Sequence, residues 1–251
     1  MRRVTTSVDS CSCSSATSRP GCAVEEADVI RGAGAGVPLP GAPVREWVVV
    51  VPVKRAEIGK SRLRIPGVDR EPLARAIALD TVEAAAACER VAEVIVVTSD
   101  EVTATALRLL PRVRLVRDRG EGLTTAIGLG VSAAPDMRPR AVLLGDLPAL
   151  RPDELARALA FASSHPRAFV PDAEGTGTVL ATARAGFDLT PRFGSDSASA
   201  HRAAGFAEVG FPVLSGLRRD LDHAEHLRAA RRAGLGPRTA ALVDRPLVLA
   251  S

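Results

Sequence analysis

Short runs of apolar residues alternate with helix-length segments from about residue 47 onward. The first run, WVVVV at residues 47–51, is apolar at every position, which is typical of a strand buried on both faces of a parallel sheet. This run breaks at Pro52 into a polar, basic loop. Further strands are predicted at residues 94–98, 113–116, 141–144 and 178–182, and one more begins at Phe169 and Val170.

The segments between these strands carry helix signals. Asp69 can cap a helix from about residue 71 to residue 88, in which Leu73 and Ile77 recur at helical spacing. Pro152 suits the first turn of another helix, because the amide that proline lacks is not needed there. Further helices are expected up to Leu110, up to Ala134 and over residues 198–204. Strands separated by helices imply right-handed crossovers, so the sequence predicts an α/β fold with a mostly parallel sheet.

The first 45 residues differ from the rest of the chain. They are rich in Ser, Gly, Ala and Pro and show no periodic pattern. We expect residues 1–45 to be a disordered leader, or the product of a start codon assigned too far upstream. A single domain is expected over residues 46–251. Three of the four cysteines lie in the leader, but they lack a fourth ligand and the spacing of a zinc site, so free thiols are the simpler expectation.

Composition narrows the range of partners. The 251 residues are 46% hydrophobic, which is ample for a core, but no run of about 18 apolar residues exists to span a membrane. The first residues lack the apolar region of a secretory signal, so we expect a cytoplasmic protein. The net charge of +4 would permit nucleic-acid binding, but the arginines are dispersed, aromatics make up 3% and tyrosine is absent. We therefore expect a small anionic substrate and no nucleic acid.

The basic loop after the first strand holds Lys54 and Lys60, the only two lysines among 33 basic residues. Residues 59–61 spell GKS, which suggests a P-loop, but Lys54 stands where that motif needs its first glycine. What remains is a loop with backbone amides and two cationic side chains, which suits a triphosphate. We predict that both lysines hold phosphate, and a solvated basic loop is the alternative.

Carboxylates follow the predicted strands at the edge where parallel sheets bind ligands. Asp100 follows the strand at residues 94–98, and Asp146 follows the strand at residues 141–144. Asp220 and Asp222 have the spacing that would place both side chains on one face of a strand. Because magnesium prefers oxygen ligands and accompanies triphosphate chemistry, we predict that the separated Asp sites converge on one ion. An Asp146 that only caps the following turn is the alternative.

Two segments rich in small residues could hold an anion. PRFGSDS, at residues 191–197, precedes a predicted helix, and small residues there would expose amides to a carboxylate or phosphate. A plain helix cap is the alternative. EGTGT, at residues 174–178, could add hydroxyl donors or serve only as a hairpin connection. His223 and His226 mimic a metal pair, but a surface helix is the simpler interpretation. The sequence offers no nucleophile elbow, so covalent acyl chemistry has no support.

Seven motifs occur in a recognisable order: VPVKRAEIGKSRL, VTSD, EGLTTAI, GDLPAL, GTGT, PRFGSDS and RRDLDHAEHL. In this combination the chain resembles the guanylyltransferases of coenzyme F-420 biosynthesis, the 2-phospho-L-lactate or phosphoenolpyruvate guanylyltransferase family. The likeness covers about residue 47 to the C-terminus. GDLPAL alone is shared with many nucleotidyltransferases, whereas its combination with KSRL, GTGT and RFGSDS is specific.

The resemblance implies a Rossmann-like three-layer sandwich of the nucleotide-diphospho-sugar transferase type, as in molybdenum-cofactor guanylyltransferases. It also implies that GTP and a phosphorylated three-carbon acid give a guanylated diphosphate and pyrophosphate. The acceptor, a phosphoenolpyruvate-type acid, would be bound by Thr178, Gly194 and Ser197. The nucleotide is expected at Lys54, Lys60, Ser61, Asp100 and Thr124, and Mg²⁺ at Asp146, Asp220 and Asp222.

One departure from the family pattern concerns the nucleotide. Relatives usually have Leu-Asn where this chain has Leu123 and Thr124, and threonine lacks the second function of the amide. We expect GMP transfer to phosphoenolpyruvate, with a downstream transferase taking the unstable product. The alternatives are transfer to 2-phospho-L-lactate or 3-phospho-D-glycerate, another nucleotidyltransferase of this fold, and a non-catalytic GTP-binding regulator. The sequence leaves the oligomeric state, including a homo-oligomer, open.

Overall fold

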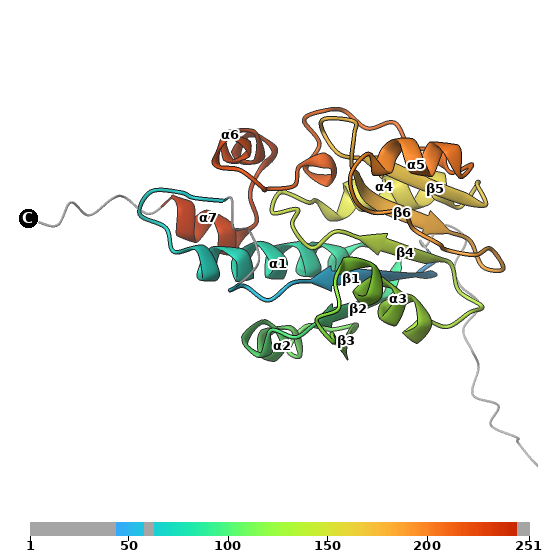
Figure 1. Cartoon of the computed structure of the whole chain (residues 1–251), viewed down its shortest axis with the longest axis horizontal. Coiled ribbons are helices and arrows are strands. Elements are labelled where there is room, and N and C mark those ends of the chain that lie inside the picture. Colours follow the sequence, from blue (N-terminus) through green and yellow to red (C-terminus); the bar gives the residue numbers. More distant parts are fainter. Residues whose placement is uncertain (1–43, 58–62, 245–251) are drawn as a thin grey trace, which may run out of the picture. The chain divides into compact units, whose positions relative to one another are not determined.

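Strand β1 lies inside a sheet that orders the rest of the chain. The computed structural model describes residues 44–57 and 63–244, and within these ranges seven strands form one sheet in the order β3-β2-β1-β4-β6-β5-β7 (Figure 1). The strands are β1 (Trp47–Val53), β2 (Val91–Thr98), β3 (Val113–Arg117), β4 (Arg140–Leu143), β5 (Arg167–Pro171), β6 (Thr178–Ala183) and β7 (Ala207–Glu208). Only β6 runs antiparallel to its described neighbours β4 and β5. The mostly parallel sheet predicted from the sequence is confirmed.

Helices cover both faces of this sheet. They are α1 (Arg70–Ala87), α2 (Glu101–Leu107), α3 (Leu123–Ala133), α4 (Pro152–Ala162), α5 (Ser197–Ala203), α6 (Ala224–Ala233) and α7 (Pro237–Val243), with a 3₁₀ turn η1 (Gly216–Arg218). Buried residues of α1, α2 and α4 pack in one cluster with Val49 and Val51, and those of α3 and α5 pack in another with Val48 and Val50. The alternation of side chains along β1 thus gives each face its own core, and the predicted three-layer sandwich is confirmed.

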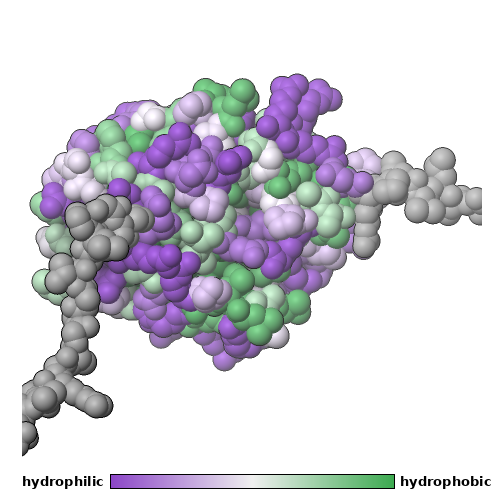
Figure 2. All heavy atoms as spheres, turned by 180° about the vertical axis from the view of Figure 1, so that it is seen from behind, coloured by the Kyte–Doolittle hydropathy of each residue, from purple (hydrophilic) through white to green (hydrophobic). Residues whose placement is uncertain are grey.

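Helices α6 and α7 form an outer addition to this sandwich. Leu227 of α6 and Val243 of α7 pack in a third cluster with Leu73 and Ile77 of α1. Figure 1 shows α7 next to α1. Helix α1 is therefore enclosed between the sheet and these C-terminal helices, which explains its wide buried surface. Among the described residues, no helix is both long and apolar enough to cross a membrane. On the face shown in Figure 2, hydrophobic and hydrophilic surface is interspersed.

The antiparallel strand β6 determines which residues meet at the carboxyl edge of the sheet. Leu143 of β4 pairs with Leu180 of β6, and the amide of Leu144 donates to the carbonyl of Val179 at 2.9 Å. Because β6 runs opposite to β4, its first residue, Thr178, lies at the edge where β4 ends. The parallel strands β1, β2 and β4 also end there, so this edge gathers side chains from distant parts of the sequence.

Several sequence expectations differ from the structure. Helix α2 ends at Leu107 instead of Leu110, and strand β4 covers residues 140–143 instead of 141–144. Asp220 and Asp222 do not lie on a strand but in an irregular segment between η1 and α6. The apolar pattern around these aspartates is too short for sheet pairing, and Leu221 instead packs in the third cluster. Residues 1–43 of the leader, Lys60 and Ser61 lie outside the described residues.

Candidate active site

Two adjoining hollows lie at the carboxyl edge of the sheet. One is lined by residues that include Leu144, Asp146, Asp222 and helix α1, and the other by residues that include Ser99 and Asp118. They share the lining residues Pro52, Val53, Lys54 and Leu123, which come from the end of β1 and the start of α3. The two hollows are therefore parts of one depression, positioned by the ends of β1, β2, β3 and β4.

Gly145 brings Asp146 into this depression. A Cβ atom at Gly145 would lie 2.9 Å from the carbonyl oxygen of Pro52 and 3.1 Å from Cγ2 of Val53. A real Cβ atom does not come within 3.0 Å of a backbone oxygen. Only glycine therefore lets the chain pass this close to the end of β1. The amide of Leu147 then donates to Oγ1 of the buried Thr81 on α1 at 3.1 Å. The close approach at Gly145 and the hydrogen bond of Leu147 thus fix the backbone on both sides of Asp146.

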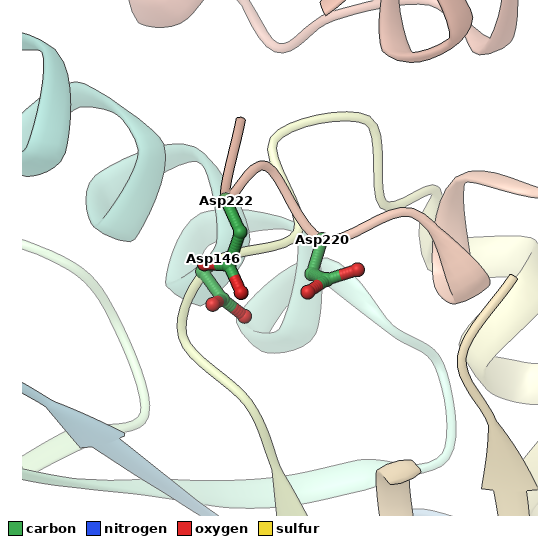
Figure 3. Close-up of side chains that lie close together, drawn as sticks. All are labelled: Asp146, Asp220 and Asp222. Carbon is green, nitrogen blue, oxygen red and sulfur yellow. The ribbon is translucent and has the colours of Figure 1, made fainter. Parts of the chain in front are cut away.

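Asp146, Asp220 and Asp222 converge, as Figure 3 shows. One carboxylate oxygen from each residue lies within 4.8 Å of the other two. The amide of Leu221 donates to the carbonyl of Asp146 at 3.1 Å, which joins the two chain segments. The Leu221 side chain is fully buried in the third cluster. With Leu221 fixed in this way, the two aspartates that flank it are held beside Asp146.

The segment that carries Asp220 is anchored further upstream. Glu154 of α4 is buried and accepts hydrogen bonds from the amides of Gly216 at 3.2 Å and Leu217 at 3.1 Å. Arg218 donates through Nε to the carbonyl oxygens of Pro171 and Asp172. These bonds tie η1 to α4 and to the end of β5. The acidic segment therefore has a defined position before any ligand binds.

The three carboxylates suit a divalent cation. They supply only hard oxygen ligands, and Asp146 and Asp220 are partly buried while Asp222 is exposed. Magnesium and manganese accept such ligands and keep further positions for water or phosphate oxygens. Three carboxylates this close together repel one another, and a divalent cation would offset that repulsion. The geometry therefore fits a metal centre at the carboxyl edge of the sheet, on the side where Asp222 is exposed.

Known proteins agree with this architecture. A family model described as the MobA-like NTP transferase domain matches residues 68–239. A phosphoenolpyruvate guanylyltransferase of Streptomyces coelicolor is 46% identical over 208 residues, which cover 81% of this chain and 98% of the relative. The enzyme of the same name from Salinispora arenicola is 50% identical over 203 residues, covering 78% and 92%. The chain belongs to the phosphoenolpyruvate guanylyltransferase family.

A solved structure supports the fold of this phosphoenolpyruvate guanylyltransferase family member. The nucleotidyl transferase from Methanothermobacter thermautotroptrophicus matches with a TM-score of 0.50 and 23% identity, over 75% of this chain and 97% of that chain. The resemblance inferred from the seven motifs is thereby confirmed at the level of family and fold. The roles of single residues have to be argued from their surroundings.

The expected nucleotide residues have different surroundings in this family member. Lys54 is exposed at the end of β1 and lines both hollows. Thr124 is exposed in the first turn of α3 and lines neither hollow. Lys60 and Ser61 lie outside the described ranges. Of Lys54 and Thr124, only Lys54 is placed to meet a ligand in the depression.

Asp100 has a structural role that the sequence did not indicate. It accepts hydrogen bonds from the amides of Ala56 at 3.0 Å and Thr103 at 2.8 Å, and Nε of Arg75 lies 3.4 Å away. Burial alone would raise the pKa of Asp100, but the hydrogen bonds from Thr103, Ala56 and Arg75 outweigh burial and lower this pKa to about 2. Asp100 thus anchors the loop after β1 to the start of α2.

The expected acceptor residues lie on the other side of the edge. Thr178 and Ser197 are both buried, whereas Gly194 is exposed and has a φ angle of 138°. Oγ1 of Thr178 and the carbonyl oxygen of Ser197 approach the same ring nitrogen of His201, at 3.0 Å and 2.8 Å. The structure therefore brings Thr178 and Ser197 together.

Sequence reasoning missed two residues of this region, His201 and Asp118. His201 lies within a short Ala-rich segment where nothing but its polar type marked it. Asp118 follows β3 just as Asp100 follows β2, so the rule of strand ends could have found it. His223 precedes α6 and its ring lies 5.5 Å from that of His226, outside the carboxylate cluster. Only His226 lies on α6 itself, and a surface helix without a metal remains the simpler interpretation.

Proposed function

We propose that this protein transfers GMP from GTP to phosphoenolpyruvate and releases pyrophosphate. The observation that carries the proposal is the convergence of Asp146, Asp220 and Asp222 beside Lys54, in a chain of the phosphoenolpyruvate guanylyltransferase family. A phosphate oxygen of phosphoenolpyruvate would attack the α-phosphorus of GTP. The new bond joins this oxygen to the α-phosphorus, and the bond from the α-phosphorus to the bridging oxygen breaks as pyrophosphate leaves.

This chemistry needs little from a protein base. The phosphate of the acceptor is already ionised at neutral pH and can act as the nucleophile without losing a proton. Catalysis then consists of aligning the attacking oxygen with the α-phosphorus and compensating negative charge. The depression offers Lys54 as a cation beside the three carboxylates. Lys60 and Ser61, on the same loop, would complete the contacts with the departing pyrophosphate.

We propose Asp146, Asp220 and Asp222 as the ligands of Mg²⁺. A bound divalent ion supplies positive charge that stabilises the triphosphate and its transition state. The protein contributes three oxygen ligands whose positions are fixed by Gly145, Leu221 and Glu154. The exposed position of Asp222 leaves the cluster accessible from the depression, where the triphosphate would lie.

The second hollow is the proposed site of the guanine base. Its lining includes the apolar side chains of Val53, Leu123 and Ala126, which suit the faces of a purine. Asp118 also lines it and accepts a hydrogen bond from the amide of Gly120 at 3.0 Å through Oδ1. A carboxylate here can accept from N1–H and the 2-amino group of guanine, a pair of donors that adenine lacks.

The acceptor would occupy the side of the edge formed by β6 and α5. Thr178 lies where β4 ends, so an acid bound by Thr178, Gly194 and Ser197 would face the carboxylate cluster. We further propose that the reaction belongs to coenzyme F-420 biosynthesis in the cytoplasm. Because the diphosphate product carries an enol ester, a downstream transferase would have to take it up directly.

A panel of acceptors tests the proposal. The protein is incubated with Mg²⁺, GTP and either phosphoenolpyruvate, 2-phospho-L-lactate or 3-phospho-D-glycerate, and pyrophosphate release is measured. We expect phosphoenolpyruvate to give the highest kcat/KM. Faster turnover of another acid would replace phosphoenolpyruvate as the substrate. Absence of pyrophosphate with every acceptor, despite GTP binding, would favour a non-catalytic GTP-binding regulator.

A further inference from the structure

His201 is the most completely enclosed titratable ring in the described part of the chain. It lies on α5 with no exposed surface and contacts three phenylalanine rings. Phe169 stacks on it with ring centroids 5.5 Å apart, while Phe193 and Phe206 meet it edge-on at 5.7 Å and 4.9 Å. An alkyl side chain would fill such a site more simply, so the two ring nitrogens need an explanation.

Both ring nitrogens of His201 are engaged, and their partners fix the tautomer. Nε2 accepts a hydrogen bond from the backbone amide of Arg192 at 3.0 Å, so it carries a lone pair and no proton. Nδ1 therefore carries the proton and can donate to the carbonyl oxygen of Ser197 at 2.8 Å, with Oγ1 of Thr178 at 3.0 Å as a second neighbour. Only the neutral ring satisfies all of these contacts.

These contacts join three separate pieces of the acceptor region. Thr178 begins β6, Ser197 begins α5, and Arg192 belongs to the loop that leads to Gly194. The loop also packs on the ring through Phe193. A protonated His201 would place an N–H group against the amide of Arg192, and this contact would be lost.

We propose that His201 is a positioning residue that holds the acceptor-binding loop against β6 through its neutral, Nδ1-protonated ring. The inference rests on the proposed function, because it assumes that phosphoenolpyruvate binds at Thr178, Gly194 and Ser197. His201 touches neither substrate nor metal in this arrangement. Loss of the His201 contacts lowers the affinity for the acceptor. GTP binding, at the other part of the edge, stays unchanged.

The surroundings of His201 favour the neutral ring. Burial lowers the pKa of His201, the hydrogen bond to Ser197 works in the opposite direction, and the positive charge of Arg192 lowers this pKa further. The charged groups of the neighbouring elements lie behind the phenylalanine rings: Arg167 of β5 lies over Phe206, Arg202 of α5 lies over Phe169, and Glu208 of β7 pairs with Arg202 at 2.7 Å. The loop is therefore held in place at neutral pH and released as pH falls through the lowered pKa.

Steady-state kinetics of three variants test this role. His201→Phe keeps the ring volume and removes both nitrogens, and we expect it to raise KM for phosphoenolpyruvate about tenfold while KM for GTP stays within about twofold. His201→Gln can restore an acceptor and a donor, and we expect it to recover most of the affinity. His165→Phe, the same change at a half-buried histidine after α4, serves as the control.

Acid pH supplies a readout that a merely structural role would not change. KM for phosphoenolpyruvate in the wild type should rise on acidification more steeply than in His201→Gln, and the ionisation of phosphoenolpyruvate itself is common to both. Hydrogen exchange at the Arg192 amide should accelerate in His201→Phe. If the wild type is active and His201→Phe has an unchanged KM for phosphoenolpyruvate, the positioning role is wrong and the proposed function stands. Parallel pH profiles of the wild type and His201→Gln would have the same meaning. A wild type that does not turn over GTP and phosphoenolpyruvate would refute the proposed function and this inference with it.

Discussion

At the residue scale, backbone hydrogen bonds fix the positions of the acidic side chains. The bond from the Leu221 amide to the Asp146 carbonyl joins a strand end to a segment more than 70 residues away in the sequence. Glu154 fixes the start of that segment through the amides of Gly216 and Leu217. Such fixed carboxylates can bind a cation without rearranging, which lowers the cost of binding.

Asp146→Asn tests the proposed metal ligand that follows strand β4. The change keeps the size of the side chain and removes its charge, so we expect kcat/KM to fall about 100-fold or more while the fold is retained. Circular dichroism and pyrophosphate release measure the two properties. Asp136→Asn is the matched control, because the Asp136 side chain is 93% exposed and lies before β4, at the opposite end of that strand. Full activity of Asp146→Asn would remove Asp146 from the metal centre.

The sequence was sufficient to predict which polar residues follow the strands, but it could not predict which other residues these side chains contact. The rule that ligands bind at the carboxyl edge pointed to Asp146, and the structure places Asp220 and Asp222 beside it. The same rule pointed to Asp100, whose hydrogen bonds hold the loop after β1. His201 was missed because its role depends on a fold in which β6 and the loop at Arg192 come together.

At the element scale, helix α3 has to approach the sheet closely for the edge to form. Gly130 allows this approach, because a Cβ atom there would overlap with Cγ1 of Val50 and lie 2.9 Å from Cγ2 of Val97. The start of the same helix contributes Leu123 to both hollows. A shift of α3 away from β1 and β2 would therefore change the proposed base site as well as the core.

Two glycines of α3 provide a matched test of this packing. Gly130→Ala should lower the free energy of unfolding by about 1–3 kcal/mol through overpacking, and it should raise KM for GTP. Gly128→Ala should be neutral or raise this free energy by about 0.5–1 kcal/mol, because a Cβ atom at Gly128 meets nothing within 4 Å. Urea unfolding of both variants measures the difference. Equal effects at the two positions would show that α3 does not contact the sheet as described.

The loop after β1 depends on Asp100. The pKa of this carboxyl falls from 3.8 to about 2 in the folded protein, so its charged form adds stability at pH values above about 4. This stability, on the order of 2 kcal/mol, should be lost as pH falls from about 4 to about 2. Unfolding of wild type and Asp100→Asn, compared at pH 7 and pH 3, measures it. A difference between the two proteins that does not shrink at pH 3 would contradict the anchoring role.

At the scale of the whole molecule, one edge of the sheet collects the proposed nucleotide, metal and acceptor sites. The alternating strand and helix pattern was sufficient to predict the class of fold and this edge, because hydrophobic periodicity is a local property. The reversed direction of β6 was only one of two alternatives, the hairpin connection at residues 174–178, since strand direction depends on tertiary pairing. That reversal places Thr178 at the edge beside the end of β4.

Metal binding should stabilise the molecule as a whole, because the three ligands join β4 to the segment before α6. With Mg²⁺ at about ten times its Kd, we expect Tm to rise by about 3 °C in the wild type. Asp222→Asn should lose most of this rise without a large change in its metal-free Tm, since Asp222 is exposed. Differential scanning calorimetry with and without EDTA measures both. An equal rise in the variant would place the cation elsewhere.

The product itself tests the central claim most directly. After incubation with Mg²⁺, GTP and phosphoenolpyruvate, ³¹P NMR of the reaction mixture distinguishes a diphosphate bridge between GMP and the acceptor from simple hydrolysis. We predict pyrophosphate together with two mutually coupled resonances of an enolpyruvyl diphosphate, one derived from GTP and the other from phosphoenolpyruvate. Formation of GDP and orthophosphate, or of GMP with unaltered phosphoenolpyruvate, would contradict guanylyl transfer.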